Sequence, residues 1–81
     1  MKVGQKARLV TFNGELECSE YCDPSENYWS LINLTGTVVK DVNSRGRVTV
    51  TFDANVGSKG LHCHNEIPNS LHILPSDLAV I

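Results

Sequence analysis

The feature that most constrains this chain is a pair of alternating segments joined by a short polar turn. In RVTVTFD, residues 47–53, every second residue is apolar, and we expect these to face the core: Val48, Val50 and Phe52. Alternation with a period of two predicts a β-strand that buries one face. TGTVVKDV, residues 35–42, predicts a second strand, and NSRG, residues 43–46, has the residue types of a tight turn. The three segments together predict an antiparallel hairpin.

Three further segments predict strands, one before this hairpin and two after it. KARLVTF, residues 6–12, alternates and is rich in β-forming residues, and SLHIL, residues 70–74, has a similar composition. PSDL, residues 75–78, predicts a turn because proline cannot donate to a strand ladder. LAVI then predicts a last strand over 78–81.

The segment between the first two strands predicts a short helix over residues 24–32. Asp23 is a favourable N-cap, Pro24 suits the first helical position, and Glu26 lies three residues after the cap, as in a capping box. On an α-helix, one apolar face would contain Tyr28, Leu31 and Ile32. Trp29 would then lie about 100° around the helix axis from Tyr28 and would be more exposed than Tyr28.

Residues 54–69 predict a loop because they contain glycines, asparagines and a proline, with room for a short strand at 60–64.

Several motifs resemble an SH3-like barrel of the bacterial, KOW-related kind: GQKARLV, GTVV, RVTVTFD and HILPSDLAVI. The resemblance covers residues 1–12, 35–53 and 70–81, and leaves insertions at 13–34 and 54–69. It implies a mostly β fold, namely a small SH3-like barrel of about five strands with a short helix in the first insertion. It says little about function, because this barrel carries many unrelated activities.

Length and composition predict a single domain, 1–81, without a membrane segment. The chain has 81 residues, and no apolar run approaches the ~20 residues that a spanning helix needs. The N-terminus lacks the long apolar region of a signal peptide. Three cysteines, an odd number, fit a reducing compartment, so we expect a cytoplasmic protein without membrane partners.

Charge is distributed unevenly, and it singles out the first insertion. Residues 13–33 contain five acidic residues and no Lys or Arg, whereas the rest of the chain holds seven basic and four acidic residues. The same insertion holds three of the five aromatic residues, a type that often anchors interfaces. The insertion is either a solvated loop or a surface for a basic partner.

We therefore predict a non-catalytic binding module that contacts another protein, or a second copy of itself in a homo-oligomer. The expected partner-binding residues are Tyr21, Tyr28, Trp29, Glu20 and Glu26. So small a chain would suit an accessory protein of a phage or another mobile element.

Cysteine and histidine residues in the two insertions raise the possibility of a zinc site. Cys18 and Cys22 are separated by three residues, and His62 and His64 by one, so the two histidines would share a face of a strand. Zinc could then tie the insertions together. The alternatives are an ordinary loop with a buried thiol at Cys63, in which case no cofactor is expected, and a disulfide between Cys18 and Cys22, which a reducing compartment disfavours.

A second candidate function is a KOW-like module associated with nucleic acid. Lys40, Arg45 and Arg47 surround the expected hairpin turn and are candidates for phosphate contacts. The pI near 5.8 argues against an autonomous nucleic-acid binder.

An enzymatic function is a further alternative. NSLHILP resembles the pore-lining strand of the plasmid-borne, trimethoprim-insensitive dihydrofolate reductases, but His72 and Leu74 stand where that family has Gln and Tyr. Leu71 and Ile73 are expected in the core. Cys63 lies between two histidines, but neighbours on a strand point apart, which argues against a Cys–His pair. We predict that the chain is not an enzyme.

Overall fold

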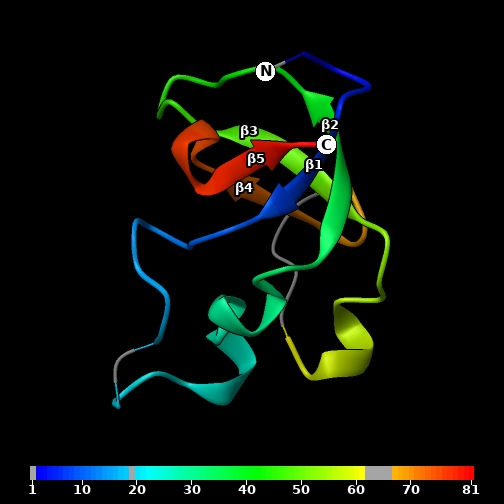
Figure 1. Ribbon diagram of the computed structural model, residues 1–81. Coiled ribbons are helices and arrows are strands. Elements are labelled where there is room, and N and C mark those ends of the chain that lie inside the picture. Colours follow the sequence, from blue (N-terminus) through cyan, green and yellow to red (C-terminus); the bar gives the residue numbers. More distant parts are fainter. Residues whose placement is uncertain (1, 19, 62–66) are drawn as a thin grey trace.

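The computed structural model describes residues 2–18, 20–61 and 67–81 and contains one antiparallel sheet (Figure 1). The five strands are β1 (Lys6–Leu9), β2 (Thr35–Lys40), β3 (Val48–Phe52), β4 (Ser70–Ile73) and β5 (Leu78–Val80). Their order in the sheet is β4-β3-β2-β1-β5. The prediction of a mostly β chain is confirmed, and the strands predicted at 6–12, 35–42, 47–53, 70–74 and 78–81 each exist in a shorter form. The sheet is open, with β4 and β5 at its edges, rather than closed by a ladder into the expected barrel.

The hairpin of β2 and β3 forms as predicted because its turn satisfies its own backbone. The side-chain oxygen of Asn43 accepts hydrogen bonds from the backbone N–H groups of Arg45, at 2.9 Å, and Arg47, at 3.1 Å. Gly46 adopts the positive φ, 76°, that the turn requires. Val38 then pairs with Val50, which places two apolar residues on the same face.

Gly36 lets β2 pass close to β3. A Cβ atom at this position would lie 2.7 Å from the backbone oxygen of Thr51 and 2.7 Å from a methyl group of Val50. A Cβ atom does not come this close to other heavy atoms, so no larger residue fits without movement of β3. The glycine is therefore needed for close packing.

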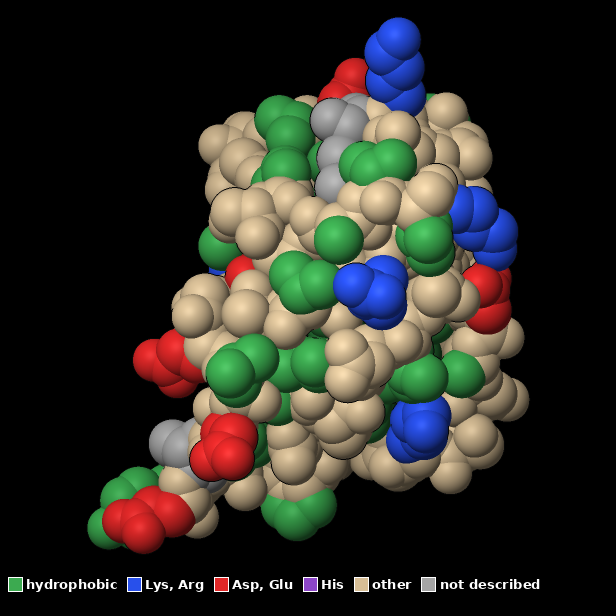
Figure 2. Space-filling model, in the orientation of Figure 1, with side chains coloured by type: hydrophobic (Ala, Val, Ile, Leu, Met, Phe, Trp, Pro, Cys, Tyr) green, Lys and Arg blue, Asp and Glu red, His purple; other side chains and the backbone are tan. Residues whose placement is uncertain are grey.

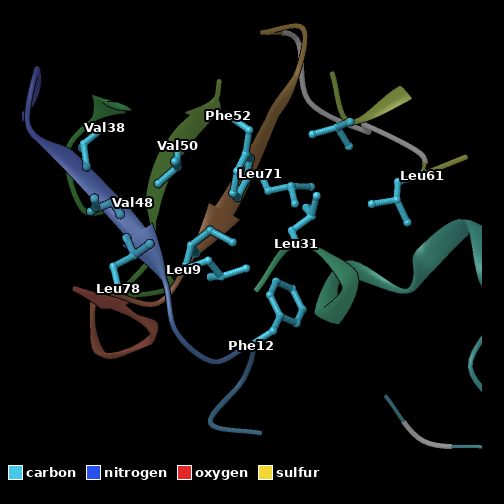
Figure 3. Packing of buried hydrophobic residues seen from close by; sticks show 13 residues of the cluster. Leu9, Phe12, Leu31, Val38, Val48, Val50, Phe52, Leu61, Leu71 and Leu78 are labelled. Atoms are coloured by element: carbon cyan, nitrogen blue, oxygen red, sulfur yellow. The ribbon is translucent and has the colours of Figure 1, made fainter. Parts of the chain in front are cut away.

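The core lies against one face of the sheet, and both insertions cover it. The alternating residues of the strands converge there, and Phe12, just before the first insertion, packs with them together with Leu31 and Leu61 of the two insertions (Figure 3). Val56 of the second insertion belongs to the same cluster. The predicted burial of Val48, Val50 and Phe52, and of Leu71 and Ile73, is confirmed.

The predicted helix over 24–32 is replaced by two 3₁₀ helices, η1 (Pro24–Glu26) and η2 (Tyr28–Leu31). The N-cap is correct, because the Asp23 carboxylate accepts a hydrogen bond from the backbone of Ser25 at 2.9 Å. Asn27 separates the two turns with a non-helical ψ of 71°. So short a segment gains little from an α-helix of its own, and its shape is instead set by packing on the core.

Among the helices that the structure describes, none has the length and apolar character to cross a bilayer.

The second insertion begins with η3 (Gly57–Lys59) and is tied to the sheet by Asn69. The side-chain amide of Asn69 donates to the backbone oxygens of Phe52, at 2.6 Å, and Ala54, at 2.7 Å. Its side-chain oxygen accepts from the backbone N–H of Val56 at 2.6 Å. The strand expected at 60–64 falls mostly on residues outside the described part of the chain.

The PSDL turn forms η4 (Pro75–Asp77) and carries a buried carboxylate. Asp77 is 1% exposed and accepts three hydrogen bonds, from the Thr11 hydroxyl at 2.7 Å and from the backbone N–H groups of Asn13 and Gly14, both at 2.9 Å. The backbone oxygen of Asp77 also accepts from Val10 at 2.8 Å. The carboxylate thus joins the start of the first insertion to the end of the sheet.

We expect Asp77→Ala to lower the free energy of unfolding by about 3 kcal/mol, because it leaves buried donors without an acceptor. Asp77→Asn should cost less, since it keeps one oxygen but turns an N–H group toward a donor. Ser76→Ala, at an exposed position of the same turn, is the control and should stay within about 0.5 kcal/mol. Urea unfolding measures all three, and equal stability of the Asp77→Ala variant and the control would contradict this role.

An ion pair links β1 to the end of β3. Lys6 Nζ lies 2.8 Å from Asp53 Oδ1, and the Thr35 hydroxyl donates to Asp53 Oδ2 at 2.7 Å. The hydrogen bond from Lys6, followed by the one from Thr35, holds the pKa of Asp53 below its ordinary value of 3.8.

Because the pKa of Asp53 is lower in the folded protein, its contribution to stability is complete above about pH 4 and is lost as the pH falls below that value. In Lys6→Met we expect the pKa of Asp53 to rise toward 3.8, whereas Lys40→Met should leave it unchanged. An NMR titration of the Asp53 carboxyl carbon measures both. An unchanged pKa of Asp53 in Lys6→Met would show that the ion pair is not its cause.

Candidate functional site

The first insertion forms an open groove of about 560 Å³ on the surface of the protein. Its base and walls come from the turn after β1, the segment that carries the Cys18–Cys22 disulfide and the two 3₁₀ helices. The groove is lined by aromatic residues, carboxylates and the disulfide: Phe12, Glu15, Cys18, Tyr21, Cys22, Asp23, Glu26, Tyr28 and Trp29.

Three aromatic rings pack together at this groove. Phe12 is buried, and its ring centroid lies 4.8 Å from that of Trp29 in an edge-to-face contact and 5.6 Å from that of Tyr28 in a tilted one. Such contacts are favourable beyond their buried area. Tyr28 and Trp29 are only partly buried, so each keeps some surface for a ligand.

Phe12 reaches this position because the chain reverses immediately after it. The backbones of Phe12 and Glu15 bond to each other in both directions, at 2.9 and 3.1 Å, around a turn in which Asn13 and Gly14 have positive φ. Asp77 holds the N–H groups of the same two turn residues. A buried carboxylate therefore positions the aromatic base of the groove.

Acidic side chains surround the aromatic residues. The carboxylates of Glu15, Asp23 and Glu26 line the groove and all three residues are exposed. In Figure 2, acidic side chains gather at the lower left, where Figure 1 places the tip of the insertion, and no Lys or Arg is visible in that corner. The groove therefore combines negative charge with aromatic surface.

The predicted partner-binding residues lie in or beside this groove. Tyr21, Tyr28, Trp29 and Glu26 line it, and Glu20 is exposed next to Tyr21. Tyr21 is 90% exposed and is the most accessible of the aromatic residues. Packing of Tyr28 on the core is confirmed.

The expectation that Trp29 is an exposed anchor is wrong in one respect, because its side chain packs against Phe12 and the core. Tyr28, Trp29 and Ile32 all pack against the core, so the segment does not leave Trp29 on an exposed face as the expected α-helix would. The indole Nε1 is buried and has no hydrogen-bond partner among the described residues, as is also true of Asn27 Oδ1. Both side chains line a second, smaller groove of about 340 Å³.

Cys18 and Cys22 form a disulfide, with their Cα atoms 6.0 Å apart, against the expectation of two reduced thiols. Both cysteines line the aromatic groove. In the described part of the chain, residues 16–18 and 20–22 take no part in the backbone hydrogen bonds of turns and loops, and the disulfide restrains the local shape of this wall of the groove.

The predicted zinc site is not assembled among the described residues, where no three potential metal-ligating side chains come together. Cys18 and Cys22 bind each other, and disulfide sulfurs are not the thiolates that zinc requires. His62 and His64 lie outside the described residues, as does Cys63. Zinc binding stays a prediction that applies to the reduced form.

Of the three basic residues proposed for nucleic-acid contacts, Arg47 has a structural role. Its guanidinium donates to the side-chain oxygen of Asn13, at 2.7 Å, and to the backbone oxygen of His72, at 3.2 Å. It thereby braces the hairpin against the turn that carries the groove. Lys40 and Arg45 are exposed.

The strand compared with the reductases carries no comparable constellation in its described residues. His72 is exposed, and its Nδ1 lies 3.0 Å from the hydroxyl of Thr49 on β3. Leu74 is the residue that precedes η4.

Sequence reasoning found the acidic and aromatic character of the insertion but missed Phe12 and Asp77. Phe12 falls within the predicted strand 6–12, and Asp77 falls within the predicted turn 75–78. A signal was present for Phe12, since the Asn-Gly pair that follows it, residues 13 and 14, is a typical two-residue turn. Nothing local marks Asp77, because its partners lie more than sixty residues away.

Comparison with protein-family models, curated proteins and solved structures finds no match to this chain.

We expect Trp29→Ala to lower the free energy of unfolding by about 2–4 kcal/mol, because it removes packing against Phe12 and the core. Tyr21→Ala, by contrast, should change it by less than about 0.5 kcal/mol, since the side chain is exposed. Thermal and urea unfolding measure both variants. A Trp29→Ala variant as stable as the wild type would restore Trp29 as a freely exposed anchor.

Proposed function

We propose that the chain is a non-catalytic binding module that recognises a protein partner through the insertion at 13–34. The observation that carries this proposal is the open groove with aromatic residues at its base and an exposed tyrosine at its edge. Tyr and Trp are the residue types that most often anchor protein interfaces. The turn and the disulfide restrain two sides of the groove, which lowers the entropic cost of binding.

We further propose that the scaffold is of the SH3-like, KOW-related kind, with the barrel left open between β4 and β5. The proposal is supported by the element order: β1 pairs with both β2 and β5, β2 to β4 form a meander, and a 3₁₀ turn precedes the last strand. Binding surfaces on small β scaffolds are commonly built by loops between rigid strands. The long first insertion fits that arrangement.

The competing functions have less support. Arg47 is engaged within the protein, which leaves Lys40 and Arg45 as the exposed basic residues of the hairpin, too few for a strong phosphate contact. The proposal of a cytoplasmic location rests on the odd number of cysteines. The Cys18–Cys22 disulfide argues the other way, because disulfides persist mainly in oxidising compartments.

Selection of peptides from a displayed random library tests the proposed function. We expect the wild-type chain to enrich ligands that bind saturably, and Tyr21→Ala to weaken them about tenfold or more, as truncation of an interface anchor does. Ser76→Ala, in the turn before β5 and away from the groove residues, is the control and should bind like the wild type. Native mass spectrometry shows whether a second copy fills the groove instead. A monomer that enriches no ligand would overturn the proposal.

A further inference from the structure

The groove places negative charge and aromatic surface within reach of a single ligand. Three exposed carboxylates, of Glu15, Asp23 and Glu26, share it with Tyr28 and Trp29. No Lys, Arg or His is among its described lining residues. Residues 13–33 contain no Lys, Arg or His.

These two properties select the charge of a ligand. Carboxylates attract a cation and repel phosphate, and the faces of Tyr and Trp carry the negative side of the ring quadrupole, which also favours a cation. An aliphatic side chain would gain from the aromatic rings but nothing from the carboxylates. A cation with a flat, weakly hydrated head gains from both.

We propose that the groove binds a basic segment of a partner protein and that an arginine side chain of this segment is the anchor. The guanidinium is planar, stacks on aromatic rings and pairs with a carboxylate through two parallel hydrogen bonds, whereas an ammonium group is more strongly hydrated. This inference rests on the proposed function, because it names the chemistry of the partner for the same groove.

The chain's own charges support an external partner over a second copy. Its exposed arginines, Arg8 and Arg45, are isolated from each other, Arg8 on β1 and Arg45 in the hairpin turn. Arg47 is held by Asn13 and His72. A partner with several neighbouring basic residues would match the acidic insertion more fully.

Trp29 is the single tryptophan of the chain, so its fluorescence reports directly on the groove. The probe is a short acetylated peptide that alternates glycine and arginine, and its control replaces every arginine by citrulline, which has nearly the same shape and no charge. We expect a saturable change in Trp29 fluorescence with the arginine peptide and at least tenfold weaker binding of the citrulline peptide. A matching lysine peptide should bind several-fold more weakly than the arginine peptide.

Two variants with the same change in charge show whether the groove is the site. Glu15→Gln removes a carboxylate from the groove, whereas Asp41→Asn removes one from the exposed segment after β2. We expect Glu15→Gln to weaken the arginine peptide about threefold to tenfold, consistent with a partly exposed ion pair strengthened by neighbouring rings, and Asp41→Asn to stay within about twofold. If Glu15→Gln lowers the thermal unfolding temperature, Glu26→Gln replaces it.

Failure of this inference is distinguishable from failure of the proposed function. If library-selected peptides bind in a Tyr21-dependent manner but contain no arginine, and the arginine peptide leaves Trp29 fluorescence unchanged, the function stands and the arginine anchor is overturned. Equal effects of Glu15→Gln and Asp41→Asn, or equal binding of the citrulline peptide, also overturn it. A dimer whose dissociation accompanies peptide binding would assign the groove to a second copy and overturn the external partner.

Discussion

The buried carboxylate of Asp77 is the interaction on which the rest of the structure most depends. A charged group at 1% exposure is tolerated only because donors surround it, and here the donors are the Thr11 hydroxyl and two backbone N–H groups of the following turn. These partners lie at the start of the chain and Asp77 lies near its end. One side chain therefore fixes how β5 closes against β1 and where the first insertion leaves the sheet.

The candidate groove follows from that closure. Once the turn at Asn13 and Gly14 is held, Phe12 points into the protein and forms the surface against which Tyr28 and Trp29 pack. Arg47 supports the same turn from the hairpin side through Asn13. The groove is thus supported from two parts of the sheet, although its ligand-facing residues come mainly from the insertion. A disulfide restrains the outer wall, where the backbone makes few contacts with the body.

The strands and the hairpin could be predicted because their signals are local. Alternation over 47–53 and the Asn43 turn act within a few residues, and the structure keeps both. The position of the helical segment could be predicted, but its division into two 3₁₀ helices could not. Its N-cap is local chemistry, whereas the division at Asn27 reflects the fit of Tyr28 and Leu31 to a surface that other segments build. The same fit turned Trp29 toward the core, where a regular α-helix would have left it outside.

The sequence by itself determined the β-rich class of this protein, the strand order along the chain and the acidic, aromatic character of one insertion, because each depends on neighbouring residues alone. Only the tertiary structure decided that the sheet stays open, that Cys18 and Cys22 pair, and that Phe12 joins Tyr28 and Trp29 in one groove. These outcomes require contacts between distant segments. Burial of apolar side chains and the long-range hydrogen bonds of Asp77 stabilise these contacts, and no local sequence pattern encodes them.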